Sequence, residues 1–334
     1  MVAFYVGAYT ADMGGAATGI AALGRLDDGS LEHLGQAVAA DSPSYLAVSG
    51  DVVYAAAEAT GRIESYRRTG THALQPIASA EAGGVAPCHV ARYGDTVVAA
   101  CYVDGTLGVL SADPLALVQR VEAQETAAQG TAASLPGPHP AQDGAHAHAT
   151  FALDATTILS ADLGADRVYV HTLADGRLTR TGSLDLPSGT GPRDFVRHPS
   201  GLVFVLGELS LDVVVLRFSA GELTVVDRVA LAGGEPGDHA AALTLGPDAR
   251  FAYAGLRGSN RISILATDGE TLTAVGFVDA GGDWPRHHVV DGDVMHVANE
   301  RSSSVASFRL GDDGVPVLIA PAIAVASPIF LLPV

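Results

Sequence analysis

The sequence predicts an all-β protein, in which a single domain over residues 1–334 forms a ring of seven four-stranded sheets, a seven-bladed β-propeller. Three observations predict this fold. A short motif recurs seven times, further strand-like segments follow it, and the two ends of the chain supply complementary parts of one repeat.

The recurring motif is a small or turn residue followed by an apolar strand. Its copies occupy residues 42–48, 86–92, 145–151, 191–197, 238–244, 284–290 and 327–333. Aligned neighbours lie 43 to 48 residues apart, except for one interval of 60 residues. A second strand, a third strand, a tight turn and a fourth strand follow, as in residues 202–231. Four short strands in about 45 residues are typical of one propeller blade.

The two ends of the chain complete one blade. The last copy, residues 327–333, has no second strand after it, whereas residues 4–10 look like a second strand without a first. We expect the C-terminal strand to be the innermost strand of the blade that the N-terminus begins. This pairing closes the ring and leaves no open edge between the first and last blades.

The interval of 60 residues contains an insertion at about residues 123–144, rich in Ala, Gly, Pro and Gln. We predict a long loop there. Long loops often have a function, but a solvated surface insertion explains the composition equally well.

Charge and composition exclude several classes of function. The net charge of −18 argues against nucleic acid or an anionic membrane as partner. All 19 basic residues are arginine, which excludes a Schiff-base lysine and a lysine general base. Residues 1–10 lack the basic start of a signal peptide, and two cysteines, Cys88 and Cys101, are too few for a disulfide scaffold. We expect a cytoplasmic protein, monomeric or weakly dimeric.

Blade geometry predicts where polar side chains gather. The start of each first strand and the end of each second strand lie on one face, so these positions from different blades converge on one funnel. The polar residues at the starts of first strands are His148, Arg193 and Arg286, followed one residue on by His89 and His287. The alignment places Cys101, Glu208 and Asn299 at the ends of second strands, with Arg257 just after that position. A concave site with convergent polar groups is the first candidate for an active site.

The stretch from His146 to His148 leaves three roles open. Residues two apart on a strand share a face, so both imidazoles can look into the funnel. They could bind a metal with Asp143 or His139 as a third ligand, although no second cluster completes the shell. His148 could act as a general acid or base. A structural role in satisfying backbone groups is also open, especially for His146, His89 and His287.

Arg193 and Arg286 occupy equivalent places in non-adjacent blades. A buried arginine needs a partner, and Arg193 could simply form a salt bridge with Glu208. Two arginines in one funnel also favour an anionic substrate, because guanidinium binds carboxylate and phosphate through two hydrogen bonds.

Several segments resemble the seven-bladed lactonase family. They include "HAHATF" (146–151), "GTGPRDFVRHPSG" (189–201) and "GGDWPRHHVV" (281–290). This family includes propeller-type 6-phosphogluconolactonases and 3-carboxymuconate lactonizing enzymes. The resemblance implies a metal-independent site without a cofactor, in which the catalytic histidine is His148, the Gly-Pro-Arg arginine is Arg193 and the carboxylate is Glu208. It also assigns further arginines to Arg257 and Arg286.

The chain departs from the family pattern in one wall of the pocket. Many members carry Ala-Glu-Ile-His where this chain has "AALT", so that Ala242 replaces the glutamate and Thr244 the histidine. Their "SNRG" motif is "GLRG" in this chain, at residues 255–258. His239, just upstream, is a candidate to compensate for the missing groups.

We expect a lactone hydrolase of carbohydrate metabolism that acts on a small anionic sugar lactone, with 6-phosphogluconolactone as the first candidate. His148 would activate water, oriented by Glu208 or by the Arg193–Glu208 pair, while the arginines bind the anion. The substrate-binding residues would be Arg286, Arg257, His89, His146, His287 and Asn299. The alternatives are lactonization of a carboxymuconate-like acid, a metal-dependent lactonase and a non-catalytic propeller that binds a ligand or protein on its funnel face.

Overall fold

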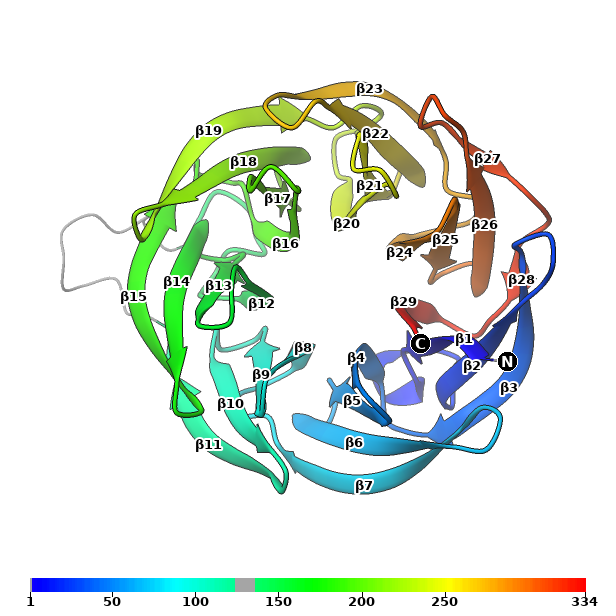
Figure 1. Ribbon diagram of the computed structural model, residues 1–334, viewed down its shortest axis with the longest axis horizontal. Coiled ribbons are helices and arrows are strands. Elements are labelled where there is room, and N and C mark those ends of the chain that lie inside the picture. Colours follow the sequence, from blue (N-terminus) through cyan, green and yellow to red (C-terminus); the bar gives the residue numbers. More distant parts are fainter. Residues whose placement is uncertain (1, 124–135) are drawn as a thin grey trace.

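The computed structural model describes residues 2–123 and 136–334. Seven sheets stand around a central channel, and each presents its innermost strand to that channel (Figure 1). This arrangement confirms the predicted all-β, seven-bladed propeller. A short 3₁₀ helix, η1 (Ala11–Met13), accompanies the strands of the described residues.

Blades 1 to 4 each contain four strands, which follow one another from the channel outward. Blade 1 contains β29 (Pro328–Pro333), β1 (Val2–Ala8), β2 (Gly19–Arg25) and β3 (Leu31–Ala39). Blade 2 contains β4 (Pro43–Ser49), β5 (Val52–Ala57), β6 (Arg62–Thr69) and β7 (Ala73–Glu81). Blade 3 contains β8 (Pro87–Tyr93), β9 (Thr96–Cys101), β10 (Leu107–Ala112) and β11 (Leu115–Val121). Blade 4 contains β12 (Ala147–Ala152), β13 (Thr157–Asp162), β14 (Arg167–Ala174) and β15 (Arg177–Asp185).

Blades 5 to 7 follow in the same order. Blade 5 contains β16 (Pro192–Arg197), β17 (Val203–Gly207), β18 (Asp212–Ser219) and β19 (Glu222–Ala230). Blade 6 contains β20 (His239–Leu245), β21 (Phe251–Arg257), β22 (Arg261–Thr267) and β23 (Leu272–Asp279). Blade 7 contains β24 (Pro285–Asp291), β25 (Val294–Asn299) and β26 (Ser304–Leu310), and its outer edge is shared by β27 (Pro316–Leu318) and β28 (Ile323–Ala324).

The ring closes as the sequence predicts. The C-terminal strand β29 pairs antiparallel with β1, and Leu332 lies opposite Tyr5. The last strand of the chain is therefore the innermost strand of blade 1, and neither terminus leaves an unpaired sheet edge at the channel.

The core consists of apolar layers between neighbouring blades. Leu159 of blade 4 and Val205 of blade 5, for example, belong to one cluster of buried side chains. Second strands pack on both faces, as in β17, where every residue is apolar and buried. Outer strands such as β15 alternate between buried and exposed positions, because one face meets solvent.

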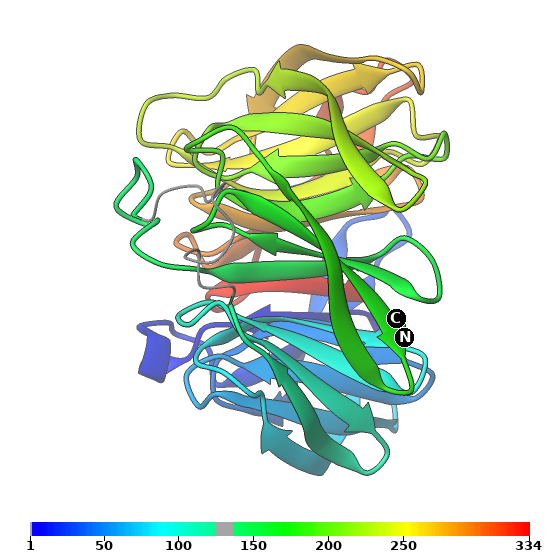
Figure 2. The same ribbon diagram turned by 90° about the vertical axis from the view of Figure 1, so that its left-hand side faces the viewer.

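The two faces of the ring differ. Figure 2 shows η1 at the left edge and both termini on the right, and the innermost strands begin on the face that carries η1. We call this side the funnel face. No helix among residues 2–123 and 136–334 is long and apolar enough to cross a membrane.

The predicted loop at residues 123–144 is only partly visible, because residues 124–135 lie outside the described residues. The described part packs near the ends of second strands on the funnel face. Gln142 is fully buried, and its Nε2 donates to the carbonyl of Leu163 (3.0 Å) and to Asp166 Oδ1 (2.7 Å). The rings of His139 and His239 meet edge to face, with centroids 5.6 Å apart.

Candidate active site

A β-bulge at the start of every innermost strand aims a side chain into the funnel. In β16, Pro192 lies opposite Gly207 and Asp194 lies opposite Leu206, which leaves Arg193 as the extra residue. The same register shift occurs in all seven blades. The residues at this position are Ser44, Cys88, His148, Arg193, Ala241, Arg286 and Ile329, and all of them line one cavity. Bulges re-aim side chains in this way, and the structure brings the first-strand starts together as the repeat predicts.

A second ring of side chains comes from the residue that follows each second strand. The N–H of Glu208 donates to the carbonyl of Gly191 (2.9 Å), which is the residue just before the innermost strand. Ser42, Ala86, Gly191, Trp284 and Ser327 hold this place in their blades with φ between 37° and 68°. This left-handed backbone turns the carbonyl toward the second strand. The residues so placed are Tyr9, Glu58, Tyr102, Leu163, Glu208 and Glu300, together with Arg257, which pairs with His239.

The predicted alignment of second-strand ends is wrong by one residue for Glu208. Cys101 and Asn299 pair with the first residue of their inner strands, whereas in blade 5 that partner is Gly207. A Cβ on Gly207 would lie 2.2 Å from Ser210 Oγ and 2.6 Å from Asp212 Oδ1, so both side chains would have to move for a larger residue. The carboxylate comes one residue later, where its side chain reaches the funnel.

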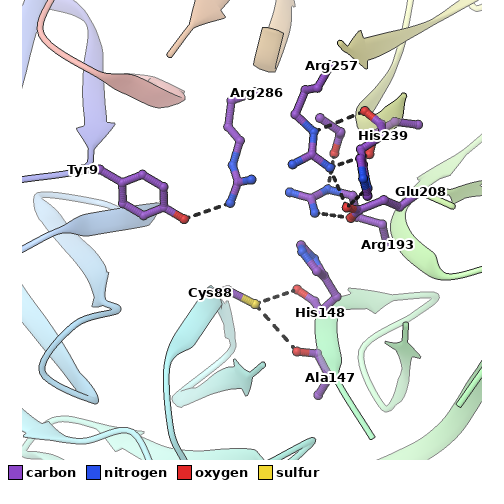
Figure 3. A network of polar contacts seen from close by, with 11 residues as sticks. Tyr9, Cys88, Ala147, His148, Arg193, Glu208, His239, Arg257 and Arg286 are labelled. Carbon is purple, nitrogen blue, oxygen red and sulfur yellow. Dashed lines mark hydrogen bonds and ion pairs between the residues drawn. The ribbon is translucent and has the colours of Figure 1, made fainter. Parts of the chain in front are cut away.

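The cavity at the centre of the funnel has an empty volume of about 490 Å³. Besides the bulge residues, its lining includes Tyr45, Glu58, Asp194, Ala149 and Phe330, as well as His89 and His287. Its two sides carry different polar clusters, which Figure 3 shows together with the imidazole of His148.

The first wall is a buried cluster built around the Glu208 carboxylate. Arg193 donates to Oε2 at 2.5 Å, Arg257 donates to Oε1 at 2.7 Å, and Nδ1 of His239 lies 3.1 Å from Oε1. Glu208, Arg193 and Arg257 are each less than a tenth exposed. Burial alone would raise the pKa of Glu208, but the guanidiniums of Arg257 and Arg193 hold it well below its usual value. Burial lowers the pKa of Arg257 to about 9, against the opposing effect of Glu208.

The second wall contains Arg286, which comes from blade 7 and is held by a neutral phenol. One terminal nitrogen of Arg286 donates to the Tyr9 hydroxyl at 2.9 Å, and this hydroxyl donates to Glu58 Oε2 at 3.2 Å. Burial raises the pKa of Tyr9 to about 12, so the phenol stays protonated at neutral pH. Burial opposes the charge of Arg286, yet Tyr9, Glu58 and Glu300 together raise its pKa. The second wall therefore has a charged guanidinium without a direct carboxylate partner among the described residues.

His148 lies between these walls, with its imidazole pointing toward Arg193 (Figure 3). Burial and the charge of Arg193 lower the pKa of His148 well below its usual value, and Arg286 adds to this effect. The imidazole is therefore neutral at pH 7. Among the described residues, no hydrogen bond joins its ring to another side chain, and the Glu208 oxygens are occupied by Arg193, Arg257 and His239. The expectation that Glu208 orients His148 directly is wrong.

Each guanidinium keeps a nitrogen that makes no hydrogen bond to the part of the chain that the structure describes. Arg193 uses Nε for the carbonyl of Ala241 (2.6 Å) and Nη1 for Glu208, so Nη2 remains. Arg257 uses Nε and Nη2, and Arg286 uses Nη2 alone. None of these remaining nitrogens belongs to the buried, unpartnered polar atoms of the described residues, so each stays accessible to solvent. Guanidinium donors left available beside a cavity suit an anionic or oxygen-rich ligand.

Three predicted substrate-binding residues lie outside the cavity lining, namely Arg257, His146 and Asn299. His146 stacks on Tyr102, and its nitrogens contact the carbonyl of Tyr102 (2.7 Å) and Asp143 Oδ1 (2.9 Å). Asn299 is fully buried and donates to the carbonyl of Ala280 (3.0 Å). The bulge at His148 explains why the side chain of His146 does not enter the cavity, because it turns the two side chains in different directions. Asn299 points between blades because it belongs to the strand end itself rather than to the position after it.

His89 and His287 line the cavity as predicted, but both pack against aromatic rings. The centroid of His89 lies 4.4 Å from Tyr45, and that of His287 lies 4.1 Å from Phe330. Burial lowers the pKa of both histidines to about 3, so they are neutral. They form an aromatic floor beneath the charged walls.

The funnel shows no metal centre within residues 2–123 and 136–334, where no three His, Cys, Asp or Glu side chains come together to hold an ion. In particular, Asp143 binds His146 alone, and His146 and His148 do not share a direction. Cys88 lines the cavity and its Sγ contacts the carbonyl of His148 at 3.5 Å, while Cys101 is fully buried and both thiols are free.

Sequence reasoning missed Tyr9 and Glu58, and treated His239 only as a candidate to replace lost groups. The signal was available, because Tyr9 and Glu58 follow the second strands of blades 1 and 2 at the position of Glu208. Correct alignment at Gly207 would have found them.

Comparisons with known proteins agree with this geometry. Residues 3–333 match the family model for the seven-bladed β-propeller lactonases. The chain belongs to this lactonase family. It is 30% identical over 260 residues to 6-phosphogluconolactonase of Bacillus subtilis, covering 74% of this chain and 72% of the relative. The periplasmic gluconolactonase PpgL of Pseudomonas aeruginosa is 26% identical, with a TM-score of 0.86 over 99% of this chain and 98% of that one. A Lactobacillus plantarum structure is 26% identical, with a TM-score of 0.89 over 99% of both chains.

This lactonase therefore belongs to a family of lactone hydrolases, and the predicted resemblance is confirmed. In the wall that departs from the family pattern, Ala242 is buried and the Thr244 hydroxyl is buried without a partner among the described residues. His239, which lies on strand β20 together with Ala242 and Thr244, contacts Glu208 instead.

Proposed function

We propose that this lactonase hydrolyses a small anionic sugar lactone, with 6-phosphogluconolactone as the first candidate. One observation carries the proposal: Arg193 and Arg286, each with available N–H groups, line one cavity together with the neutral imidazole of His148 (Figure 3). Arg257 stands next to this cavity, where it shares the Glu208 carboxylate with Arg193. The name of the Bacillus subtilis relative supports the phosphorylated substrate, and that of the Pseudomonas aeruginosa protein supports the gluconolactone ring.

The arginines bind the anion and place the ring. The first wall carries two guanidiniums and one carboxylate, so it keeps an excess positive charge where the chain as a whole is strongly acidic. A phosphate or carboxylate takes up the available N–H groups of Arg193, Arg257 and Arg286 and replaces water there. The aromatic floor with Phe330 packs against the carbon face of the sugar.

His148 acts as the general base. Its neutral imidazole takes a proton from water as the water oxygen attacks the lactone carbonyl carbon, giving a tetrahedral oxyanion. The bond between this carbon and the ring oxygen then breaks, and the imidazolium returns its proton to the departing alkoxide. The lactone and one water molecule thus give a single product, the hydroxy acid, and His148 returns to its neutral form. Such a base typically accelerates a reaction about 10²–10⁴-fold, and a guanidinium donor to the oxyanion contributes a comparable factor.

The low pKa of His148 in the free enzyme fits an anionic substrate. Burial and the neighbouring arginines keep the imidazole neutral, but they also make it a weak base. A bound phosphate offsets the guanidinium charges and thereby raises the pKa of His148 toward neutrality. Binding of the anionic substrate thus makes His148 a stronger base.

We also propose that the reaction proceeds without a metal ion and that the protein is cytoplasmic and acts in carbohydrate metabolism. Support for metal independence comes from the sufficiency of the histidine and arginines for this chemistry. Support for the cytoplasm comes from the two free cysteines. Activity in chelator tests the first proposal, and cell fractionation tests the second.

The decisive experiment is pH-stat hydrolysis of a lactone panel by wild type and His148→Ala in the presence of chelator. The panel contains 6-phosphogluconolactone, plain gluconolactone and a carboxymuconolactone. We expect chelator-resistant turnover that prefers the phosphorylated lactone and falls at least about 100-fold in the variant. His33→Ala, an exposed histidine on β3, is the matched control and should keep wild-type turnover. Equal activity of His148→Ala contradicts the mechanism, and no turnover of any lactone favours a ligand-binding propeller.

A further inference from the structure

A second hollow lies next to the active-site cavity on the funnel face, between blades 2 and 3. Glu58 lines both the cavity and this groove, so the two spaces adjoin at this side chain. The groove has an empty volume of about 1260 Å³, which includes space open to solvent. It passes from the end of β5 at Glu58 to Glu81 at the end of β7, along the turn at residues 59–61. Two inter-strand spacings of about 4.8 Å make this path roughly 10 Å long.

The groove is hollow because its walls carry very small side chains. Ala59, Gly61, Gly84 and Ala86 all line it. A Cβ on Gly84 would lie 2.7 Å from the Cβ of Cys101 and from Asp104 Oδ1, so no larger residue fits that backbone.

Three exposed apolar side chains border the groove. Met13, Val85 and Val103 are 39%, 55% and 56% exposed and all line it. Most other exposed large apolar residues of the described chain lie on the outermost strands of blades, such as Ile77 and Val275. Apolar side chains gathered at the mouth of an active-site cavity point to a ligand that covers them.

These apolar residues are held in place by local hydrogen bonds. The N–H of Val103 donates to the carbonyl of Val85 (3.2 Å), and the N–H of Val85 donates to Asp104 Oδ2 (3.1 Å). The segment of Met13 is fixed to blade 2 because the N–H of Thr10 donates to Ser42 Oγ (3.1 Å). The border of the groove is therefore preformed.

The charges along the groove do not suit an anion. Glu58 stands at its inner end, and at its outer end Arg62 donates to Ser79 Oγ (2.7 Å) while Arg120 lies 3.3 Å from Glu122. The guanidiniums available for phosphate lie in the cavity instead. Glu81 and Asp104 also line the groove, which adds carboxylates rather than available cations. Apart from Thr60, the rest of its lining consists of small and apolar residues.

We propose that this groove holds an apolar substituent of the substrate, so that the enzyme accepts sugar-acid lactones that carry an alkyl, acyl or aryl group beyond the reacting ring. The proposal rests on the proposed function, because it places the sugar part in the active-site cavity. We assign its occupant to the same ligand because the groove adjoins the cavity at Glu58.

The test measures binding without turnover. Titration calorimetry compares D-gluconamide with N-hexyl-D-gluconamide, two unreactive analogues of the open product, on the wild-type protein. We expect the hexyl compound to bind at least about 10-fold more tightly, because several methylenes leave water. Equal binding, weaker binding, or no binding of either compound overturns the proposal.

Variants locate the effect. Val85→Asp and Val103→Asp should each reduce the preference for the hexyl compound to less than about 3-fold, because a carboxylate keeps the groove hydrated. Val275→Asp on β23 is the matched control, since Val275 is 54% exposed and lines neither the cavity nor the groove, and it should keep the wild-type preference. Circular dichroism verifies that each variant is folded. A preference that survives in both folded groove variants overturns the proposal. If instead no lactone is hydrolysed, the proposed function fails while the calorimetric result for the groove still stands.

Discussion

The two walls of the active-site cavity use arginine in different ways. In the first wall, Arg193 and Arg257 share the buried carboxylate of Glu208, and His239 completes the cluster. In the second wall, Arg286 is held by the neutral Tyr9 hydroxyl, which passes a hydrogen bond on to Glu58. The first arrangement joins blade 5 to blade 6 and holds two guanidinium charges against one carboxylate. The second leaves most of the Arg286 guanidinium available to a ligand. We infer from this difference that the first wall contributes more to stability than the second, and that the second contributes more to substrate binding.

The largest expected effect comes from breaking the first wall. Glu208→Ala leaves two buried guanidiniums without their carboxylate, so we expect it to lower the free energy of unfolding by about 3–5 kcal/mol. Glu58→Ala, its counterpart in the second wall, removes one hydrogen bond to a phenol and should cost about 1 kcal/mol. Chemical denaturation of both variants measures the difference. Equal losses in the two variants would show that the walls do not differ in this respect.

The sevenfold sequence motif predicts only part of the difference between the two walls. Seven copies of a short motif determine the blade count, the ring closure and the inward direction of His148, Arg193 and Arg286, because each copy has the same bulge. The second-strand positions were harder to predict. Gly207 disrupts the visual alignment of the strand ends, and its crowding by the side chains of Ser210 and Asp212 is seen only in the folded structure.

Partners across blades could not be predicted from one sequence. Tyr9 meets Arg286 although 277 positions separate them, and only the closed ring brings them together. Likewise, the partners of Glu208 come from two blades, and His148 is not among them. The repeat predicts which positions face the funnel, but not which neighbours pair there.

The second-largest effect is expected from the second wall itself. Arg286→Ala should raise KM for the phosphorylated lactone roughly 10- to 100-fold, because a hydrogen-bonded charge contact with the substrate is lost. The decrease in kcat should be much smaller, and stability should change little. Steady-state kinetics with phosphorylated and plain gluconolactone make the comparison. A loss in kcat at unchanged KM would assign Arg286 to the transition state instead.

The pH dependence of kcat and of kcat/KM distinguishes the substrate-bound enzyme from the free enzyme. In the free enzyme, the pKa of His148 is well below 6.5, so the base is already neutral and kcat/KM should stay flat as the pH falls through about 6. An anion on the arginines raises the pKa of His148, so the acid limb of kcat should lie at higher pH than that of kcat/KM. A 6-sulfate ester of gluconolactone is the suitable substrate, because its charge does not change in this range. Plain gluconolactone, which carries no charge, should show no such displacement, and identical limbs for the sulfate ester would contradict the proposed role of the anion.

The smallest expected effect comes from Tyr9→Phe, which removes one hydroxyl and keeps the ring. The Arg286 guanidinium loses its acceptor at 2.9 Å and Glu58 loses a donor, but the cation–π contact of Arg286 with the ring at 5.6 Å remains. One hydrogen bond of this kind is worth about 0.5–1.5 kcal/mol, so KM should rise only about 2- to 10-fold. The double variant Tyr9→Phe with Arg286→Ala should be no worse than Arg286→Ala alone, because the phenol acts through the guanidinium. Additive losses would mean that Tyr9 touches the substrate itself, and the second wall would then have two binding groups rather than one.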